Sequence, residues 1–538
     1  MRPLSVVRGC INQTHSLLKN GSLFDFGLAR PRWGRDPCPA IGTLTVWTVV
    51  LSALPKYCPL IQTTEKRPNT MRVRTSLIVY LICASLPVFL PSHATAQTFS
   101  NLYNFTSATV GANPYSNLVL TNGTLFGTAA DGGSSGNGTV FKVRTDGTGF
   151  TILHTFTGGS DGATPYAGLI LSGNTLYGAA WQGGTAGFGT VFKVSTTGTG
   201  FSTLHTFTAL SGFFNTNTDG SDPFAGVVLS SNTLYGTAVE GGKYGFGSIF
   251  RVNTNGTAFT NLHSFPGGTE GTSPYGGLTI DGTTLYGTTA NGSGTFGTVF
   301  SLNTDGTGFR NLYIFSGTDG EDPYGTLTLS GSTLYGTTRS GGTFGTGTAF
   351  KINTDGNGFM VLHNFSHASN SGTNTDGVAP SAQLFLTNNV LYGTTYSGGS
   401  VGNGAVFAVT TNGASFANLH NFTQTSGSSS TNSDGSGPTG ALFLSDNVFY
   451  GTAQYGGNSG SGIVFSLSLS TPSLRPSFSG ASFTLTWPAS ALGFTLQSTT
   501  NLASPSWSSN SPAPTIVNGQ NTITNTVLTS EKYYRLVQ

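Results

Sequence analysis

Hydrophobic and polar residues alternate along most of this chain in short runs, which are separated by glycine, asparagine and aspartate. Between residues 99 and 469, four kinds of run recur in a fixed order. The runs are rich in β-branched and aromatic residues and lack a helical period, so each predicts a β-strand. They read Pro-Tyr/Phe-x-Gly-Leu-x-Leu (165–171), Leu-Tyr-Gly-Thr (within 284–289), Gly-Thr-Val-Phe-x-Val (189–194) and Leu-His-x-Phe (153–156).

The four-strand unit occurs seven times, and the glycine of its second run marks each copy. Successive copies of that glycine lie 49 to 58 residues apart. A period near this length is typical of stacked supersecondary units, and seven units commonly form one closed ring of blades. The sequence therefore predicts an all-β chain with a seven-bladed β-propeller over residues 97–469. The marker glycines are Gly127, Gly178, Gly236, Gly287, Gly336, Gly393 and Gly451.

The repeats begin out of phase. Residues 99–105 form a lone run of the fourth kind, and the last copy ends after its third run, at 464–469. The strand missing at one end is the extra strand at the other. We therefore expect the N-terminal strand to complete the last blade as its outer strand, which would remove two open sheet edges.

The first 96 residues differ in charge from the rest of the chain. They hold eleven Lys/Arg and three Asp/Glu, whereas residues 97–538 hold eleven and seventeen. The body of the protein is thus weakly acidic, which argues against nucleic acid as a partner. All four cysteines also precede residue 97, so we expect no disulfide and no cysteine-based metal site beyond it.

Residues 71–96 have the layout of a secretory signal peptide: a basic start, an apolar core and a small-residue cleavage site before Gln97. We therefore expect a protein that is secreted or held at the cell surface, without a membrane span in the mature chain. A signal peptide belongs at an N-terminus, so residues 1–70 are interpreted as a mis-called upstream extension. A membrane span at 41–60 is the rival interpretation, weakened by Pro55 and Lys56.

The order of the strands and the turns between them resemble the kelch type of propeller blade. The same repeat, over residues 99–469, resembles the secreted bacterial tandem-repeat family described as choice-of-anchor GloVer-containing proteins, a resemblance that implies no defined activity. After a linker at 470–476, residues 477–538 show alternating strands and resemble a fibronectin-type or related β-sandwich module.

Histidine and acidic residues recur in the repeats, each with two interpretations. His154, His205, His263, His363 and His420 occupy the outer strand, where packing and hydrogen bonding suit them better than metal ligation. An acidic residue followed by glycine precedes the inner strand in six copies and fits a turn. The alternative is a ring of carboxylates at the channel mouth that holds a hard cation such as Ca²⁺. Its weak candidate metal ligands are Asp219, Asp222, Asp319 and Asp322. No other cofactor is predicted.

Length variation concentrates in the loops that lead into the inner strands, which favours one face as the binding face. The long loops are 208–222, 366–379 and 423–437, and the turns after the second strand vary from copy to copy. We predict a non-catalytic binding or scaffold protein for a glycan or a protein surface, with no catalytic residue assigned. A carbohydrate-active enzyme using carboxylates at the channel mouth is the alternative. The candidate ligand-binding residues are Trp181, Phe213, Phe214, Arg339, Tyr396 and Tyr455.

Overall fold

The computed structural model describes residues 49–51, 97–106, 109–292, 294, 296–469, 472–479, 482–489, 491–501, 506–509, 513–518, 520–526 and 532–537. The chain divides into two compact units, Thr95–Thr471 and a second unit made of Met1–Ala94 and Pro472–Gln538. Apart from 49–51, the expected upstream extension (1–70) and signal peptide (71–96) lie outside the described residues. Among the residues described, no helix has the length and apolar character needed to cross a bilayer.

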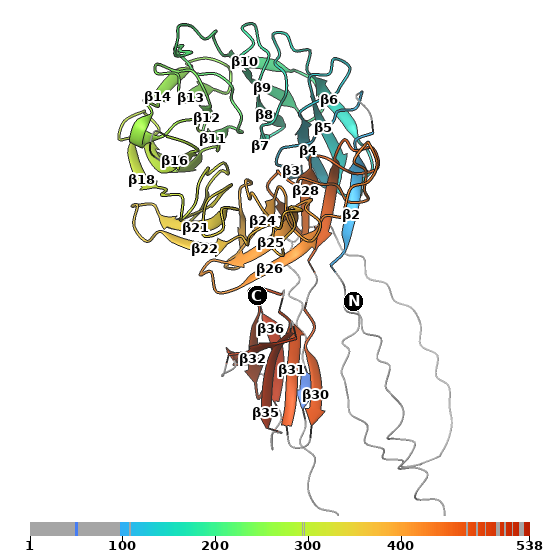
Figure 1. Cartoon of the computed structure of the whole chain (residues 1–538). Helices are drawn as coiled ribbons and strands as arrows, with labels where there is room; N and C mark the ends of the chain where they lie inside the picture. The colour runs from blue at the N-terminus through green and yellow to red at the C-terminus, as the bar shows by residue number, and fades with distance from the viewer. Residues whose placement is uncertain are drawn as a thin grey trace, which may run out of the picture. The chain divides into compact units, whose positions relative to one another are not determined.

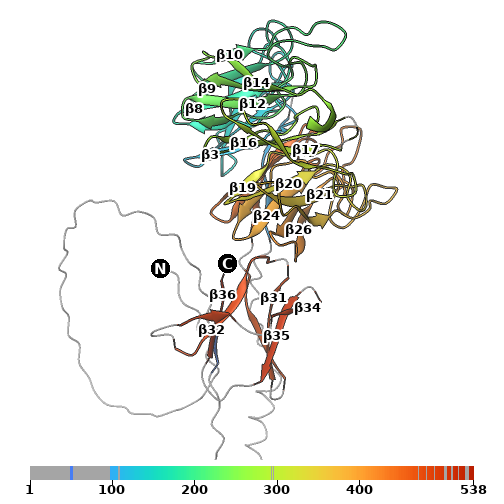
Figure 2. The same cartoon turned by 90° about the vertical axis from the view of Figure 1, so that its left-hand side faces the viewer.

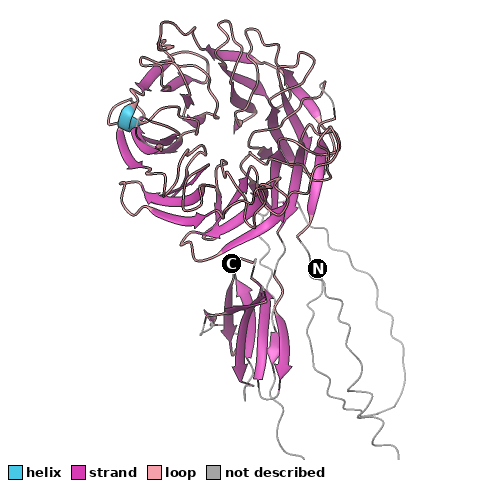
Figure 3. Ribbon diagram, viewed as in Figure 1, coloured by secondary structure: helices cyan, strands magenta, loops and turns pink. Residues whose placement is uncertain are grey.

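The first unit is an all-β propeller of repeated four-stranded antiparallel sheets, which lie side by side around a common axis (Figure 1). Figure 2 gives a second view of the same sheets. Strands and loops make up nearly all of the described chain, and the helical turn η1 (Gly268–Glu270) interrupts them in one loop (Figure 3). Each sheet contains an inner strand, two middle strands and an outer strand, in the order that the sequence pattern predicts.

The inner strands are β3 (Val119–Thr121), β7 (Ile170–Ser172), β11 (Val228–Ser230), β15 (Thr279–Asp281), β19 (Thr328–Ser330), β23 (Phe385–Thr387) and β27 (Phe443–Ser445). The second strands are β4 (Thr124–Ala129), β8 (Thr175–Ala180), β12 (Thr233–Ala238), β16 (Thr284–Thr289), β20 (Thr333–Thr338), β24 (Val390–Thr395) and β28 (Val448–Ala453). The third strands are β5 (Thr139–Arg144), β9 (Thr190–Ser195), β13 (Ser248–Asn253), β17 (Thr298–Asn303), β21 (Thr348–Asn353), β25 (Ala405–Thr410) and β29 (Ile463–Ser468). The outer strands are β6 (Thr151–Thr155), β10 (Ser202–Thr206), β14 (Thr260–Ser264), β18 (Arg310–Ile314), β22 (Met360–Asn364), β26 (Phe416–Asn421) and β2 (Phe99–Asn104).

The N-terminal strand β2 belongs to the same sheet as the C-terminal strands of the unit. It pairs antiparallel with β29, with Phe99 opposite Leu467 and Asn104 opposite Ile463. The sheet order is β2-β29-β28-β27, so β2 takes the outer position in the last sheet. This is the pairing expected from the phase of the repeats.

The inner strands are shorter than the sequence pattern predicts. Of the expected run 165–171, only Ile170 and Leu171 lie in the ladder, where β7 covers Ile170–Ser172. The preceding residues instead contact the neighbouring sheet, because Thr128 Oγ1 in β4 donates a hydrogen bond to the carbonyl of Ala167 at 3.0 Å. Backbone groups of this segment are thus satisfied between sheets as well as within one.

A hydrophobic core lies between each sheet and the next. One such cluster joins Phe126, Val140 and Leu153 of the first sheet to Leu176 and Phe192 of the second. Alternate residues of the second and third strands face these interfaces, as the period-two pattern requires. The glycine of the second strand is needed for this packing. A Cβ at Gly178 would lie 2.8 Å from the ring of Phe192 in the adjacent strand.

The second unit contains two four-stranded sheets, with the orders β30-β31-β35-β34 and β1-β36-β32-β33. Their strands are β30 (Arg475–Ser479), β31 (Ser482–Pro488), β34 (Thr515–Val517), β35 (Gln520–Thr526), β1 (Val49–Leu51), β32 (Thr495–Thr499), β33 (Ser508–Ser509) and β36 (Lys532–Val537). Both sheets contribute to one core, which contains the fully buried Trp487 and Tyr534. β30 begins at Arg475, inside the segment that the sequence assigns to a linker.

Candidate functional site

The residue before each inner-strand proline connects two neighbouring sheets and fixes the backbone of the candidate site. In the second repeat, the amide of Thr164 donates to Asn137 O at 2.9 Å, and its carbonyl accepts from the amide of Trp181 at 3.1 Å. Thr164 has a φ of 53°, in the left-handed region. The equivalent residues all share positive φ, and they are Asn113, Thr164, Asp222, Ser273, Asp322, Ala379 and Gly437.

This backbone frame places three side-chain positions of every repeat near one end of the channel between the inner strands. The first is the residue after the proline, and the other two directly follow the second strand. The side chains at these three positions differ between repeats, whereas the backbone hydrogen bonds around them are the same in each repeat. The first position holds Tyr115, Tyr166, Phe224, Tyr275, Tyr324, Ser381 and Thr439. The following two hold Ala130-Asp131, Trp181-Gln182, Val239-Glu240, Ala290-Asn291, Arg339-Ser340, Tyr396-Ser397 and Gln454-Tyr455.

Five aromatic rings from consecutive repeats form a continuous layer at this end. The ring centroids of Tyr115 and Tyr166 lie 5.0 Å apart, and those of Tyr166 and Phe224 lie 5.2 Å apart. Phe224 contacts Tyr275 edge-on at 5.4 Å, and Tyr275 stacks on Tyr324 at 4.3 Å. These distances are those of favourable aromatic pairs. All five side chains are half-buried, so one edge or face of each remains accessible.

Two further tyrosines extend the layer where the first position is small. The sixth and seventh repeats carry Ser381 and Thr439 there, and Tyr396 and Tyr455 come from the neighbouring turns. A Cβ at Gly437 would lie 3.2 Å from Tyr396 and 3.4 Å from Tyr455, so both rings pack against this glycine. The aromatic surface therefore continues across these repeats.

Trp181 and Arg339 complete the surface. The Trp181 ring lies 5.3 Å from that of Tyr166, and the Arg339 guanidinium lies 5.2 Å from the centre of the Tyr324 ring, a cation–π distance. Burial raises the pKa of the Tyr115 hydroxyl, and the positive charge of Arg339 opposes that rise. We call the whole surface the aromatic face, and it comprises Tyr115, Tyr166, Trp181, Phe224, Tyr275, Tyr324, Arg339, Tyr396 and Tyr455.

The hydroxyls of Tyr275 and Tyr455 on the aromatic face are held neutral. Burial raises the pKa of Tyr455 to about 12, and the neighbouring Tyr396 and Tyr166 reinforce the rise. Burial, reinforced by Tyr324, likewise raises the pKa of Tyr275 to about 12. A neutral phenol both donates and accepts hydrogen bonds. The face therefore offers apolar ring surfaces together with hydroxyl groups.

Carboxylates border the aromatic face. Asp131 accepts a hydrogen bond from Asn113 Nδ2 at 2.6 Å, and it contributes to the raised pKa of Tyr166, after burial. Burial, reinforced by the neighbouring Glu240, raises the pKa of Asp222 to about 6, although a hydrogen bond from Ser221 opposes the rise. A carboxyl group that titrates this high can hold a proton near neutral pH.

The sequence-predicted residues divide into two groups. Trp181, Arg339, Tyr396 and Tyr455 come together on the aromatic face. Phe213 and Phe214 lie instead at the tip of a short hairpin bridged by Ser211 and Thr216, where they are 93% and 67% exposed. Their rings contact each other at 5.2 Å.

The six acidic residues that precede a glycine do not form a ring at the channel mouth, because each of them pairs with a side chain of an outer strand. Asp219 Oδ2 is 3.0 Å from His205 Nε2 on β10 and also accepts from the amide of Thr208. Asp319 accepts a hydrogen bond from Tyr313 OH at 2.6 Å. The same pairing recurs between His154 and Asp161, His263 and Glu270, His363 and Asp376, and His420 and Asp434.

The four weak candidate metal ligands do not form one site. Asp219 and Asp319 are taken up by the outer-strand pairing, whereas Asp222 and Asp322 accept from Ser221 and Ser340 in two different repeats. Within the described ranges, no cluster of three or more His, Cys, Asp or Glu side chains could hold a metal ion.

The outer-strand histidines have a second contact that explains their position. Each stacks on a phenylalanine of the next sheet, as His205 does on Phe259 at 3.5 Å. Tyr103 and Tyr313 make the same contact in their repeats, with Phe150 and Phe359. The pairing of acid, ring and neighbouring phenylalanine thus holds adjacent sheets together, which matches the structural interpretation of these histidines.

The sequence analysis identified four members of the aromatic face and missed the five rings that form its continuous layer. These five directly follow the repeat proline, within a recurring run that by itself predicts only a strand. A usable signal existed, because this position is aromatic in five of the seven repeats and lies three residues before a buried leucine or valine. The missed residues are Tyr115, Tyr166, Phe224, Tyr275 and Tyr324.

Comparison with known proteins gives a family. A model of the Gloeobacter/Verrucomicrobia repeat matches residues 88–217, 208–375 and 369–495. A search of curated proteins gives no match.

Among solved structures, the chain is similar to an oligogalacturonate lyase from Vibrio parahaemolyticus, at 12% identity and a TM-score of 0.43, over 69% of this chain and 97% of that chain. It is also similar to a putative 6-phosphogluconolactonase from Bacteroides uniformis, at 14% identity and a TM-score of 0.40, over 77% and 98%. A chain of a nidogen/laminin complex matches at 17% identity and a TM-score of 0.35, over 55% and 93%. At these scores the likenesses carry no inference about activity.

Proposed function

The chain belongs to the Gloeobacter/Verrucomicrobia repeat family, and from its aromatic face we propose that it is a non-catalytic binding protein whose ligand is a neutral glycan. The observation that carries the proposal is the convergence of aromatic side chains from most of the repeats at one end of the channel. Half-buried rings can stack on the apolar faces of sugar rings, while the tyrosine hydroxyls bond to sugar hydroxyls.

The proposal includes closure of the repeats into a seven-bladed ring with β2 as the outer strand of the last blade. Three contacts between the last and first sheets support it. Thr452 Oγ1 donates to Ser116 O at 3.0 Å, Thr439 Oγ1 donates to Tyr115 O at 3.0 Å, and the amide of Asn113 donates to Ser461 O at 2.9 Å. These are the same kinds of contact that join the other neighbouring sheets.

The proposal also places the protein outside the cell, either secreted or at the cell surface, through the signal peptide at 71–96. Its basic start, apolar core and small-residue cleavage site support export. Mass spectrometry of the exported protein should find Gln97 at its N-terminus. An exported chain that retains residues before Met71 would contradict this part of the proposal.

Binding is tested by incubating the exported protein with a panel of neutral and acidic polysaccharides and measuring how much protein each retains. We expect retention by a neutral polysaccharide, and a loss of about tenfold in affinity for Trp181→Ala and Tyr324→Ala, because each removes one stacking surface. Phe344→Ala is the matched control, since Phe344 is an exposed turn aromatic outside the aromatic face. Retention by no polysaccharide, with capture of a protein partner instead, would overturn the glycan assignment.

A carbohydrate-active enzyme is the second candidate, and the raised pKa of Asp222 favours it. A carboxyl group that titrates at about 6 beside a second carboxylate, Glu240, resembles the acid of a glycosidase pair. Release of reducing sugar from the bound polysaccharide, lost in Asp222→Asn, would establish this candidate. Binding without release would leave the binding protein as the function.

A further inference from the structure

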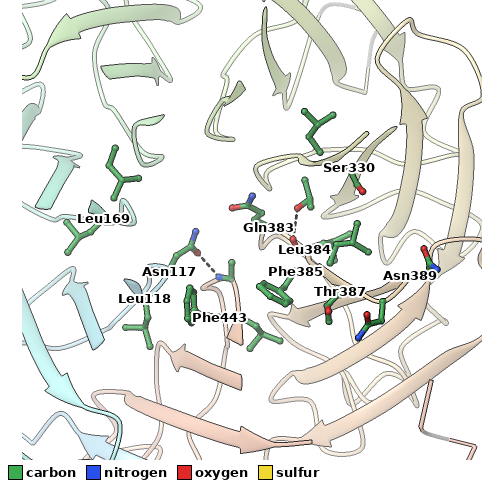
Figure 4. Close-up of a pocket in the computed structure, with 17 residues that line it drawn as sticks. Asn117, Leu118, Leu169, Ser330, Gln383, Leu384, Phe385, Thr387, Asn389 and Phe443 are labelled. Carbon is green, nitrogen blue, oxygen red and sulfur yellow. Dashed lines mark hydrogen bonds between the residues drawn. The ribbon is translucent and has the colours of Figure 1, made fainter. Parts of the chain in front are cut away.

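The channel has a second, wider end beneath the aromatic face. Inner strands there enclose a cavity of about 700 Å³, compared with about 70 Å³ among the aromatic residues (Figure 4). Asn117 and Gln383 line both spaces, so the two adjoin. The larger cavity extends toward the turns between inner and second strands, where Asn388 and Asn389 lie. Its size falls within the range of small-molecule sites.

The wall of this cavity is partly apolar. Phe385 of β23 and Phe443 of β27 lie on the same side of it in Figure 4, and Ile170 of β7 adds an aliphatic surface. These residues occupy the same register position in their strands, opposite the tyrosine of the second strand, and all three line the cavity. The lining comes from the first, second, fifth, sixth and seventh repeats and has none from the third and fourth.

Side-chain amides supply hydrogen-bonding groups to the same space. Asn117 Oδ1 accepts the amide of Ala441 at 2.6 Å, which leaves its Nδ2 without a partner among the described residues (Figure 4). Gln383 Nε2 reaches the carbonyl of Leu327 only at 3.5 Å, the outer limit of a hydrogen bond. The described lining contains no charged residue. An ionised ligand would therefore be desolvated there without a counter-charge.

We propose that this end of the channel is a second binding site, separate from the aromatic face, for an uncharged small molecule with a flat apolar part and a hydrogen-bonding edge. Phe385 and Phe443 would contact the flat part, and the amides of Asn117 and Gln383 would bind the polar edge. The site goes beyond the proposed glycan binding because it uses different side chains at the other end of the channel.

The full chain is tested with two fluorescent probes that differ in one group. Phenylnaphthylamine is neutral and flat with one N–H, and anilinonaphthalenesulfonate is the same molecule with a sulfonate. We expect saturable emission enhancement with the neutral probe and at least about tenfold weaker binding of the anionic one. No saturable binding of the neutral probe, or equal binding of both, would overturn the proposal.

Variants locate the probe. Ser330→Phe adds a ring at the cavity rim, and Gln383→Glu adds a charge, so each should weaken the neutral probe by about tenfold or more. Ser230→Phe is the matched control, because Ser230 holds the equivalent strand position in a repeat that does not line the cavity. Trp181→Phe should leave probe binding unchanged. Full affinity in both cavity variants, or loss in Trp181→Phe, would move the probe out of the cavity.

Discussion

At the scale of single residues, the threonine of the second strand has the clearest role. Its hydroxyl donates to a backbone carbonyl of the next sheet's inner segment, as Thr288 Oγ1 does to Pro323 O at 2.9 Å. A similar contact, to the carbonyl two residues after the repeat proline, joins Thr237 to Gly276 and Thr394 to Gly440. The second repeat has Ala179 at this position and therefore lacks the contact.

Replacing Thr288 by valine keeps the side-chain shape and removes the donor. Because the carbonyl of Pro323 is then left without this buried partner, we expect a loss of about 1–3 kcal/mol in the free energy of unfolding, measured by chemical denaturation. Thr283→Val is the control, since Thr283 is exposed, and should change it by less than about 0.5 kcal/mol. An unchanged stability in Thr288→Val would contradict this role of the hydroxyl.

Asp222 should make stability depend on pH. Burial, reinforced by Glu240, raises the pKa of Asp222 to about 6 in the folded protein. In the unfolded chain its pKa is about 3.9. The folded state therefore binds the proton more tightly. The contribution of Asp222 to stability is complete below about pH 4 and is lost as the pH rises through about 6.

Asp222→Asn cannot ionise and should remove this loss. The melting temperature of the variant minus that of the wild type should be larger at about pH 7.5 than at about pH 4.5. The reason is that at the higher pH the wild type carries a buried charge that the variant lacks. Other titrating groups cancel in the difference. A difference that stays constant between the two pH values would show that Asp222 titrates normally.

At the scale of elements, β2 has the largest expected effect. Deleting residues 97–106 exposes the edge of β29 and removes the stack of Phe99 on His420 at 4.2 Å. The stack of Tyr103 on Phe150 at 3.8 Å is lost as well. We expect aggregation or a large drop in melting temperature, measured by light scattering and calorimetry. A monodisperse truncation that melts like the wild type would contradict closure by β2.

The hairpin that carries Phe213 and Phe214 has a counterpart in the same chain. Ser426 and Thr431 form the same bridge as Ser211 and Thr216, but the tip of the second hairpin carries Ser428 and Ser429 in place of the aromatic pair. The fold of the hairpin therefore does not require the phenylalanines.

Converting both phenylalanines to serine should keep the fold and leave affinity for a short oligosaccharide within about twofold, since the pair stands outside the aromatic face. Titration calorimetry on the double variant measures this. A tenfold loss of affinity would add Phe213 and Phe214 to the site and support the binding role that the sequence predicts for them.

The strands, their order and the partner of β2 could be predicted because each repeat carries the same local signals at nearly constant spacing. The aromatic face could be predicted only in part. Trp181 and Tyr396 stand out because they interrupt the repeat, whereas Tyr166 and its equivalents follow it. The pairing of Asp219 with His205 joins residues 14 positions apart in sequence, and the sequence assigned the two to separate roles because only the packed outer strand brings them together.

At the scale of the whole molecule, the account rests on one aromatic face per chain. The repeats contribute different residues to it, so no single repeat can reproduce it. A ligand that binds there should occupy one place on the chain, whereas a ligand that binds the outer turns could occupy as many places as there are repeats.

Titration calorimetry with an oligosaccharide from the retained polysaccharide, combined with Trp181 emission, tests this claim most directly. We predict one ligand per chain and a change in emission on binding that is absent in Trp181→Phe. A stoichiometry approaching the number of repeats, or binding that leaves the emission of Trp181 unchanged, would contradict the aromatic face as the binding site.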